Sequence, residues 1–149
     1  MEILLKKITE DAIVPTRAYS TDSGLDVYAN ISEEIILKPL ERVLVPSGIA
    51  IQLPELEFKR MVFELQVRSK SGRALKEGLV VLNSPGTIDY SYTGEIKVIL
   101  ANLSNKDLVI KPKEKIAQLV MISVIIPDIK IVEDISGDRG TNGFGSTGI

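Results

Sequence analysis

The sequence predicts an all-β domain with one short helix, and two features of the chain indicate it. Short apolar or alternating runs, rich in Val, Ile and Leu, recur at spacings of about 8–12 residues. Turns that contain proline or glycine separate these runs. This pattern is typical of a β-sandwich, a jelly roll or a barrel.

Taken in order, the first half of the chain contains runs that we interpret as strands at residues 3–8, 24–29, 34–37, 42–45, 49–53 and 60–68. Pro15 lies in an irregular stretch, Pro39 and the 46–48 turn separate the middle strands, and Pro54 ends them. Residues 69–77 carry Ala, Leu, Lys and Arg and are the only good helix candidate, with two turns at most.

In the second half we expect strands at residues 79–82, 88–92, 95–100, 101–103, 108–110 and 116–126. After them the alternation ends, and the last residues hold five glycines with no apolar period. We therefore expect a β domain over residues 1–135 and a flexible glycine-rich arm over residues 136–149.

Composition limits the chemistry. The 149 residues suffice for one domain with a real core. The chain has no Cys and no His, which excludes disulfides, thiolate or imidazole metal sites and His-dependent nucleophilic catalysis. A general base must then be a carboxylate, Lys or Tyr, and a metal must be a hard ion bound by oxygen.

Charge and hydropathy limit the location and the partners. The net charge of −2 argues against a nucleic-acid surface. No apolar run approaches the ~18–20 residues of a membrane span, and residues 1–10 show no secretory signal. We expect a cytoplasmic protein that binds neither nucleic acid nor membrane.

The stretch from Gly78 to Leu100 is the one around which we organise the chain. It reads as strand, tight turn and strand, with the turn at residues 83–86 and with Asp89 and Tyr92 on the returning arm. That arm has few aliphatic residues for a core strand. By itself it favours an ordinary hairpin with a polar rim over a small-molecule pocket.

Two further segments are suited to binding phosphate. Residues 68–76 hold four basic side chains, and a short helix beginning there would direct free N–H groups at an anion, although a solvated connection is the plainer interpretation. In the C-terminal arm, Arg139 and the hydroxyls of Ser146 and Thr147 suit phosphate oxygens. The isolated Phe144 suits stacking on a base.

Together these segments resemble a known family. Five matching stretches occur in order: residues 24–29, 70–72, 83–94, 115–118 and 139–148. The series resembles the five motifs of the trimeric dUTP pyrophosphatases (dUTPases) and covers nearly the whole chain. The third and fifth stretches are the most specific.

The resemblance implies an enzyme that hydrolyses dUTP to dUMP and pyrophosphate with Mg²⁺. It implies a jelly-roll or distorted β-barrel fold of the dUTPase type and a homotrimer with active sites shared between subunits. Asp89 would activate the attacking water, and Tyr92 would pack on the deoxyribose and exclude a 2′-hydroxyl. Asn83 and the hairpin backbone, including Gly86 and Ile88, would read the uracil.

The resemblance also implies a phosphate-binding group and a closing arm. The residues concerned are Lys70, Ser71, Gly72, Gln118, Arg139, Phe144, Gly145, Ser146 and Thr147. Phe144 would stack on the uracil as the arm orders over the nucleotide. Asp26 would lie near Mg²⁺ and meet it through water, because this ion dehydrates reluctantly.

Several residues depart from the family pattern. Lys70 replaces an Arg, which keeps the charge but loses the planar fork. Arg73 stands where an apolar residue is usual, Lys115 replaces a frequent Arg, and Ser91 and Thr93 replace commonly charged residues. We expect activity with altered phosphate contacts.

Two alternatives stay open at this point. One is a dCTP deaminase or a bifunctional deoxynucleotide enzyme of the same fold, which would need a further carboxylate at the pyrimidine. The other is a non-catalytic nucleotide-binding regulator. The intact Asp89 and the complete arm argue against the second alternative.

Overall fold

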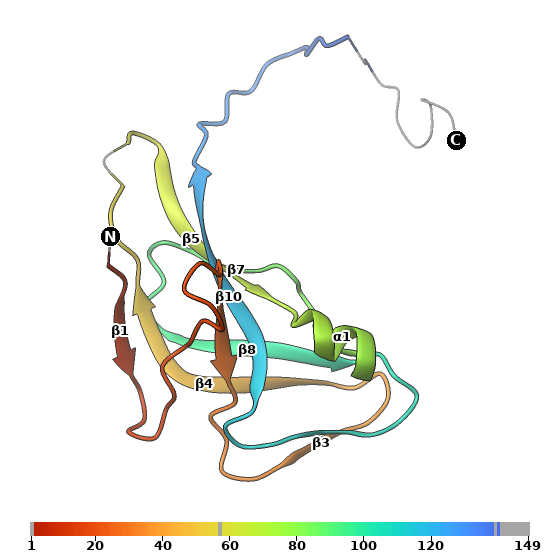
Figure 1. The fold of residues 1–149 in the computed structure, drawn as a ribbon. Coiled ribbons are helices and arrows are strands. Elements are labelled where there is room, and N and C mark those ends of the chain that lie inside the picture. The colour runs from red at the N-terminus through yellow and green to blue at the C-terminus, as the bar shows by residue number, and fades with distance from the viewer. Residues whose placement is uncertain (1, 57, 139, 141–149) are drawn as a thin grey trace.

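The computed structural model describes residues 2–56, 58–138 and 140. In the described part of the chain, all regular elements but one short helix are strands, as the sequence predicts (Figure 1). In chain order its elements are β1 (Leu4–Lys7), β2 (Gly24–Tyr28), β3 (Ile35–Leu37), β4 (Arg42–Gln52), β5 (Met61–Arg68), α1 (Ser71–Glu77), β6 (Leu79–Val81), β7 (Gly86–Ile88), β8 (Glu95–Asn102), β9 (Leu108–Ile110) and β10 (Lys115–Ile125).

Two antiparallel four-stranded sheets enclose one core, and β3 pairs with β9 beside them. The strand orders are β1-β4-β8-β6 and β2-β10-β5-β7, so neighbours in each sheet are mostly distant in sequence. Alternate side chains such as Val45 and Leu100 from the first sheet and Leu65 and Leu119 from the second are fully buried. This confirms the predicted all-β fold of jelly-roll type. Connections between consecutive strands cross from one sheet to the other.

Strand β4 differs from the sequence prediction. The expected turn at residues 46–48 is a bulge inside one continuous strand, and the register with β8 shifts between Pro46 and Ala50. Proline cannot donate to the strand ladder and is tolerated at a bulge. The Ser47 hydroxyl donates to the Ile96 carbonyl at 2.5 Å, and Gly48 N donates to Glu95 Oε1 at 3.0 Å. These bonds replace the interrupted ladder.

The expected hairpin over residues 78–100 is also different in detail. Strands β6 and β8 do pair, with Val81 opposite Leu100. However, β7 on the returning arm pairs with β5 in the other sheet, with Ile88 opposite Leu65. The segment therefore leaves one sheet, contributes a short strand to the second and returns. A local turn pattern cannot show this, because the partner strand lies far away in sequence.

Helix α1 confirms the single predicted helix. It ends at Gly78, whose φ of 75° is a left-handed conformation that favours glycine. None of its side chains is fully buried, and Lys70 at its N-cap makes no side-chain capping bond. The helix thus packs lightly on the body.

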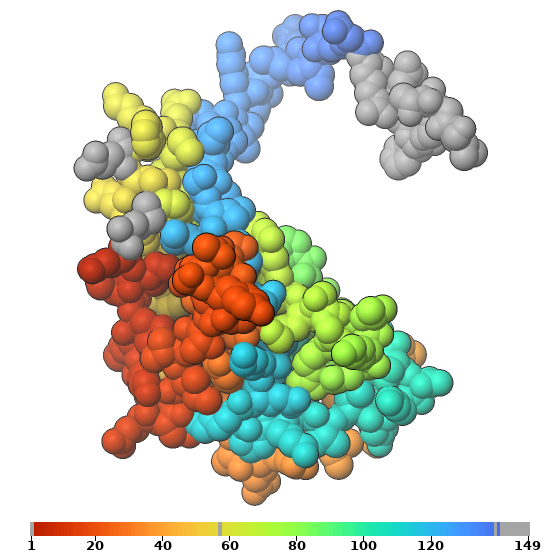
Figure 2. Space-filling model, in the orientation of Figure 1, coloured from red at the N-terminus to blue at the C-terminus, as the bar shows by residue number. Residues whose placement is uncertain are grey.

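After β10 the chain leaves the body. Ile126 N still donates to the Arg60 carbonyl at 2.8 Å and Asp128 pairs with Arg60. Beyond them the chain runs away from both sheets in an extended path up to residue 138, as Figures 1 and 2 show. In the described residues there is no helix with the length and apolar character needed to cross a membrane.

Candidate active site

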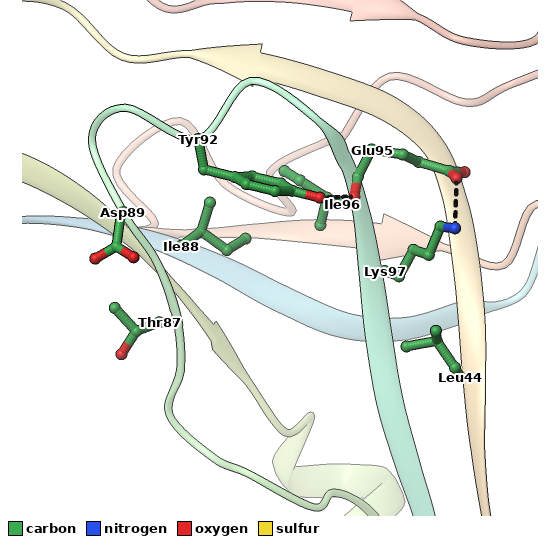
Figure 3. A pocket seen from close by; sticks show the side chains of 8 residues that line it. All are labelled: Leu44, Thr87, Ile88, Asp89, Tyr92, Glu95, Ile96 and Lys97. Atoms are coloured by element: carbon green, nitrogen blue, oxygen red, sulfur yellow. Dashed lines mark hydrogen bonds and ion pairs between the residues drawn. The ribbon is translucent and has the colours of Figure 1, made fainter.

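A pocket of about 360 Å³ opens between β7 and β8 (Figure 3). It is lined by Leu44, Thr87, Ile88, Asp89, Tyr92, Glu95, Ile96 and Lys97. The walls are therefore a mixture of aliphatic, aromatic and charged groups, which is the usual make-up of a small-molecule site. The pocket exists because β7 crosses to the second sheet and the chain must return to β8.

Tyr92 is fixed across this pocket. Its hydroxyl donates to the Glu95 carbonyl at 2.9 Å, and its backbone N–H donates to the Asp89 carbonyl at 3.0 Å. The ring also needs Gly94, because a Cβ at that position would lie 2.6 Å from the Tyr92 hydroxyl oxygen. Figure 3 shows the ring above Ile88, so both side chains face the same space.

Asp89 lies at the bend of the loop, and its side chain is exposed. It lines the pocket above and also a second one of about 320 Å³, whose wall includes Glu64, Tyr90 and Ser91. Among the described residues its carboxylate has no hydrogen bond or ion pair with another side chain. This agrees with the absence of charged residues at 91 and 93, and it leaves the oxygens open to water.

The other predicted nucleoside-binding residues lie on the same crossing segment. Asn83 is exposed at its start and folds over Gly86, where a Cβ would lie 3.1 Å from the Asn83 amide nitrogen. Ile88 is half-buried and lines the pocket, whereas Asn83 and Gly86 do not. The structure thus places Ile88, Asp89 and Tyr92 together, with Asn83 and Gly86 further back towards β6.

A second polar cluster surrounds Asp26, which is buried with only 4% of its surface exposed. Its Oδ1 accepts from the Lys70 ammonium and from Gln118 Nε2 at 3.4 Å. Its Oδ2 pairs with the Lys115 ammonium at 2.8 Å. The structure therefore unites Asp26, Lys70 and Gln118, three predicted site residues from distant stretches.

Lys115 is the member that the sequence did not assign to the site. Its ammonium also lies 5.9 Å from the centre of the Tyr28 ring, within cation–π range. Its position in the fourth matching stretch was the available signal, but nothing in the sequence shows that it pairs with Asp26. Two lysines against one carboxylate leave a net positive cluster, which favours an anion.

Electrostatics in this cluster favour an ionised Asp26. Burial raises the pKa of the carboxyl, but hydrogen bonds and ion pairs from Lys115 and Lys70 outweigh it and leave the pKa below its usual value. The same contact raises the pKa of Lys115. Both shifts favour the ion pair between an ionised Asp26 and a protonated Lys115.

Ser71 and Gly72 follow Lys70 at the start of α1. Both are exposed, and the space around Gly72 is open, since no atom would lie within 4 Å of a Cβ there. They border the Asp26 cluster through their neighbour Lys70. An anion could approach the cluster past them.

The sheet fixes where these two groups of residues stand. In neighbouring strands, Asp26 is opposite Gln118, Gln118 is opposite Arg68, and Val67 is opposite Gly86. Asp26 itself and the crossing segment thus lie on the two edge strands of the β2-β10-β5-β7 sheet, and the Lys70 side chain reaches Asp26 from the end of β5. Three strand spacings separate the two edge strands, roughly 14 Å.

Comparison with known proteins now decides the family. The dUTPase family model matches residues 10–148. The chain belongs to the dUTPase family.

Relatives and solved structures agree with this assignment. The chain is 48% identical over 150 residues to the deoxyuridine 5′-triphosphate nucleotidohydrolase of Hydrogenobaculum sp. (strain Y04AAS1), which covers 100% of this chain and 99% of that protein. It is 45% identical to the protein of the same name from Clostridium novyi (strain NT), with 100% of both covered. The dUTPase of Staphylococcus bacteriophage 80alpha with dUPNHPP is 25% identical, has a TM-score of 0.81 and covers 99% of each chain.

The carboxylates of this dUTPase family member show how an Mg²⁺ ion can be held. In the described ranges no group of three or more Asp or Glu side chains is close enough to hold an ion. Each carboxylate oxygen of Asp26 is already in an ion pair with a lysine ammonium group. These residues do not form a protein cage, but they fit Mg²⁺ that is held mainly by substrate phosphates and water.

Part of the predicted dUTPase site lies outside the described residues. Arg139, Phe144, Gly145, Ser146 and Thr147 fall in that part of the chain. Their roles stay predictions from the sequence.

The Asp26 cluster yields a prediction about stability and pH. Replacing Asp26 by Asn should lower the free energy of unfolding at pH 7 by about 1–3 kcal/mol, less than for a fully buried pair because both lysines are partly exposed. Because the folded pKa is lowered, the charged form stabilises the fold above the unfolded pKa of 3.8, and this contribution is lost as pH falls through the folded value.

The measurement is urea unfolding in metal-free buffer at several pH values between 7 and 3, at one fixed protein concentration. The wild-type protein and the Asp26→Asn variant should converge in stability as the pH falls. Asp107→Asn, which changes an exposed carboxylate, is the matched control and should differ little from wild type at any pH. A loss in Asp26→Asn that does not depend on pH would contradict the argument.

Proposed function

We propose that this chain is a dUTP diphosphatase that hydrolyses dUTP to dUMP and pyrophosphate in the presence of Mg²⁺. The observation that supports this most directly is the pocket in which Asp89, Tyr92 and Ile88 meet at the crossing segment. It offers an exposed carboxylate beside an aromatic wall, in a chain that has no histidine to act as base.

Asp89 is the proposed general base. Its carboxylate is exposed, is free of ion pairs among the described residues and borders two pockets. It can accept a proton from a water molecule as that water attacks a phosphorus atom of the substrate. The same carboxylate holds the water in line for the attack, so positioning and proton transfer come from one side chain.

Tyr92 and the crossing segment are proposed to select the nucleoside. The Tyr92 ring is held by its hydrogen bond to the Glu95 carbonyl and cannot move aside without breaking it. A deoxyribose packed on this ring leaves no room for a 2′-hydroxyl. Asn83 and the backbone around Gly86 and Ile88 read the uracil edge, and a close fit at C5 disfavours thymine.

The Asp26 cluster is proposed to receive the phosphates. Lys70, Ser71, Gly72 and Gln118 supply ammonium, hydroxyl, backbone and amide donors around a net positive site. Bound Mg²⁺ would neutralise charge on the phosphate oxygens, with Asp26 contacting it through water. Arg139, Ser146 and Thr147 add further phosphate donors, while Phe144 and Gly145 cover the uracil as residues 136–149 close over the substrate.

A homotrimer with shared sites is part of this proposal. In one chain none of the residues proposed to bind phosphate lines the nucleoside pocket, and Asp26 lies on the edge strand opposite to β7. The segment after β10 carries Ile129 and Ile131 with 93% and 94% of their surfaces exposed, which is unfavourable for an isolated chain. A second and a third copy would cover these side chains.

Light scattering coupled to size-exclusion chromatography tests the assembly. We expect three times the 16.3 kDa mass of one chain. A single-chain mass at micromolar concentration would contradict shared sites. Replacing Ile129 and Ile131 together by Ser should shift the mass towards one chain, whereas replacing the exposed Leu40 by Ser, on the β3–β4 side, should leave it unchanged.

A substrate panel tests the activity. With Mg²⁺ and dUTP, dTTP, UTP or dCTP in turn, we expect pyrophosphate release to be fast only for dUTP. Release of ammonia from dCTP would instead indicate a deaminase. The second carboxylate of the pocket, Glu95, accepts from Gly48 N at 3.0 Å and pairs with Lys97 at 3.4 Å, so it is poorly placed for that reaction.

The base is tested by replacing Asp89 with Asn. We expect turnover of dUTP to fall by about 10²–10⁴-fold, because the amide cannot accept the proton from water. The dissociation constant for dUTP, measured by calorimetry on this slow variant, should change little, since binding and base catalysis are separate contributions. Asp107→Asn is the matched control and should retain wild-type turnover. Near-normal turnover in Asp89→Asn would overturn the assignment.

A further inference from the structure

Arg73 is an unusual residue of helix α1. The helix has no fully buried side chain and no side-chain N-cap bond, so packing holds it only lightly. The Arg73 side chain, however, is only 12% exposed. A guanidinium in this setting must be satisfied by specific partners.

Two carboxylates and a carbonyl satisfy it. Nε and Nη2 donate to Glu77 Oε2 at 3.0 and 2.7 Å, within the helix. Nη1 pairs with Glu114 Oε1 at 2.8 Å and donates to the Lys115 carbonyl at 3.4 Å. The guanidinium therefore links α1 to the start of β10, because Lys115 follows Arg73 by 42 positions in the chain.

Glu114 is itself held in place. Its Oε2 accepts from Lys111 N at 2.9 Å, and its backbone carbonyl accepts from Ala29 N at 2.8 Å. Its carboxylate thus closes the turn between β9 and β10, and its backbone is tied to the end of β2. Arg73 consequently anchors the helix to ordered backbone and not to a mobile surface carboxylate.

The Arg73–Glu114 pair is connected to the Asp26 cluster through neighbouring residues at both of its ends. Lys115 follows Glu114 and pairs with Asp26, and Asp26 pairs with Lys70, which directly precedes α1. The charges alternate in sign from Lys70 through Asp26, Lys115 and Glu114 to Arg73. The step from Lys115 to Glu114 is a peptide link, the other steps are ion pairs, and the series begins and ends beside the first turn of the helix.

We propose that Arg73 is a positioning residue for the triphosphate. Its contact with Glu114 sets the distance between the first turn of α1 and the start of β10, and so fixes Lys70 and Ser71 relative to Gln118 and Lys115. Arg73 itself stays on its two carboxylates and does not contact substrate. The inference rests on the proposed dUTP hydrolysis and adds a role for a residue outside the matching stretches.

The chemistry of arginine supports this role. Its planar fork binds two carboxylates in fixed directions, which a lysine ammonium cannot do. Charge-assisted bonds of this kind are stronger than neutral ones. An apolar side chain at position 73 could pack on β10 but would leave the Glu114 carboxylate without its partner, and the helix would lose its fixed direction.

Steady-state kinetics with Arg73→Met provide the test. We expect KM for dUTP to rise about 10-fold, the size of one lost charge-assisted contact, with kcat changed less than about 3-fold because Asp89 is untouched. Inhibition by deoxyuridine, which has no phosphate, should be unchanged, because its pocket lies at the other edge of the sheet. A merely structural role would weaken both ligands.

Three further variants sharpen the result. Glu114→Gln, which removes the charge from the Arg73–Glu114 pair, should also raise KM, and the double variant should be no worse than Arg73→Met alone, since Arg73→Met already breaks that pair. Arg73→Lys should recover only part of the affinity and serves if Arg73→Met does not fold. Arg42→Met, which removes an exposed arginine on β4, should behave as wild type.

The outcomes separate the two hypotheses. An unchanged KM in Arg73→Met, equal weakening of dUTP and deoxyuridine, or additive effects of the two substitutions would each overturn the positioning role while dUTP hydrolysis stands. A wild-type chain that does not hydrolyse dUTP would overturn the proposed function and this inference with it.

Discussion

The buried carboxylate of Asp26 is the constraint on which the candidate site depends. A charge with 4% exposure must be matched by opposite charge, and two lysines and an amide from distant stretches supply it. Strand β2, strand β10 and the residue before α1 are thereby brought to one point. The excess of positive charge that results is the property that suits a triphosphate, so the same contacts that satisfy Asp26 also prepare the site.

The second constraint is the path of the segment between β6 and β8. Its pairing with β5 pulls the chain out of one sheet, and the return to β8 leaves the space that Ile88, Asp89 and Tyr92 line. Gly94 permits the Tyr92 ring to lie against the backbone. The pocket is therefore a consequence of sheet topology, and its aromatic wall is held by the hydrogen bond from the Tyr92 hydroxyl to the Glu95 carbonyl.

Asp26 and the crossing segment lie on the two edge strands of one sheet. This separation bears on how a complete site is assembled. A chain whose binding elements are apart, and whose last described segment exposes bare isoleucines, is suited to assembly with other copies. The contact between Arg73 and Glu114 lies next to the Asp26 cluster. It joins a lightly packed helix to the start of β10, beside the Asp26 cluster that we propose as the phosphate site.

The sequence by itself determined the all-β class, the one short helix, the absence of cysteine and histidine chemistry, and the motif residues that name the family. These follow from the composition of the chain and from local periodicity and turn residues, which can be read within one short segment. Only the tertiary structure decided that residues 46–48 form a bulge, that β7 joins the other sheet, and that Asp26 pairs with Lys70, Lys115 and Gln118. Asn102 is a further case, fully buried and bonded to the carbonyls of Leu37 and Lys106 at 2.8 Å. Such contacts join residues up to 92 positions apart, and their geometry is set by sheet order and register, which no local pattern contains.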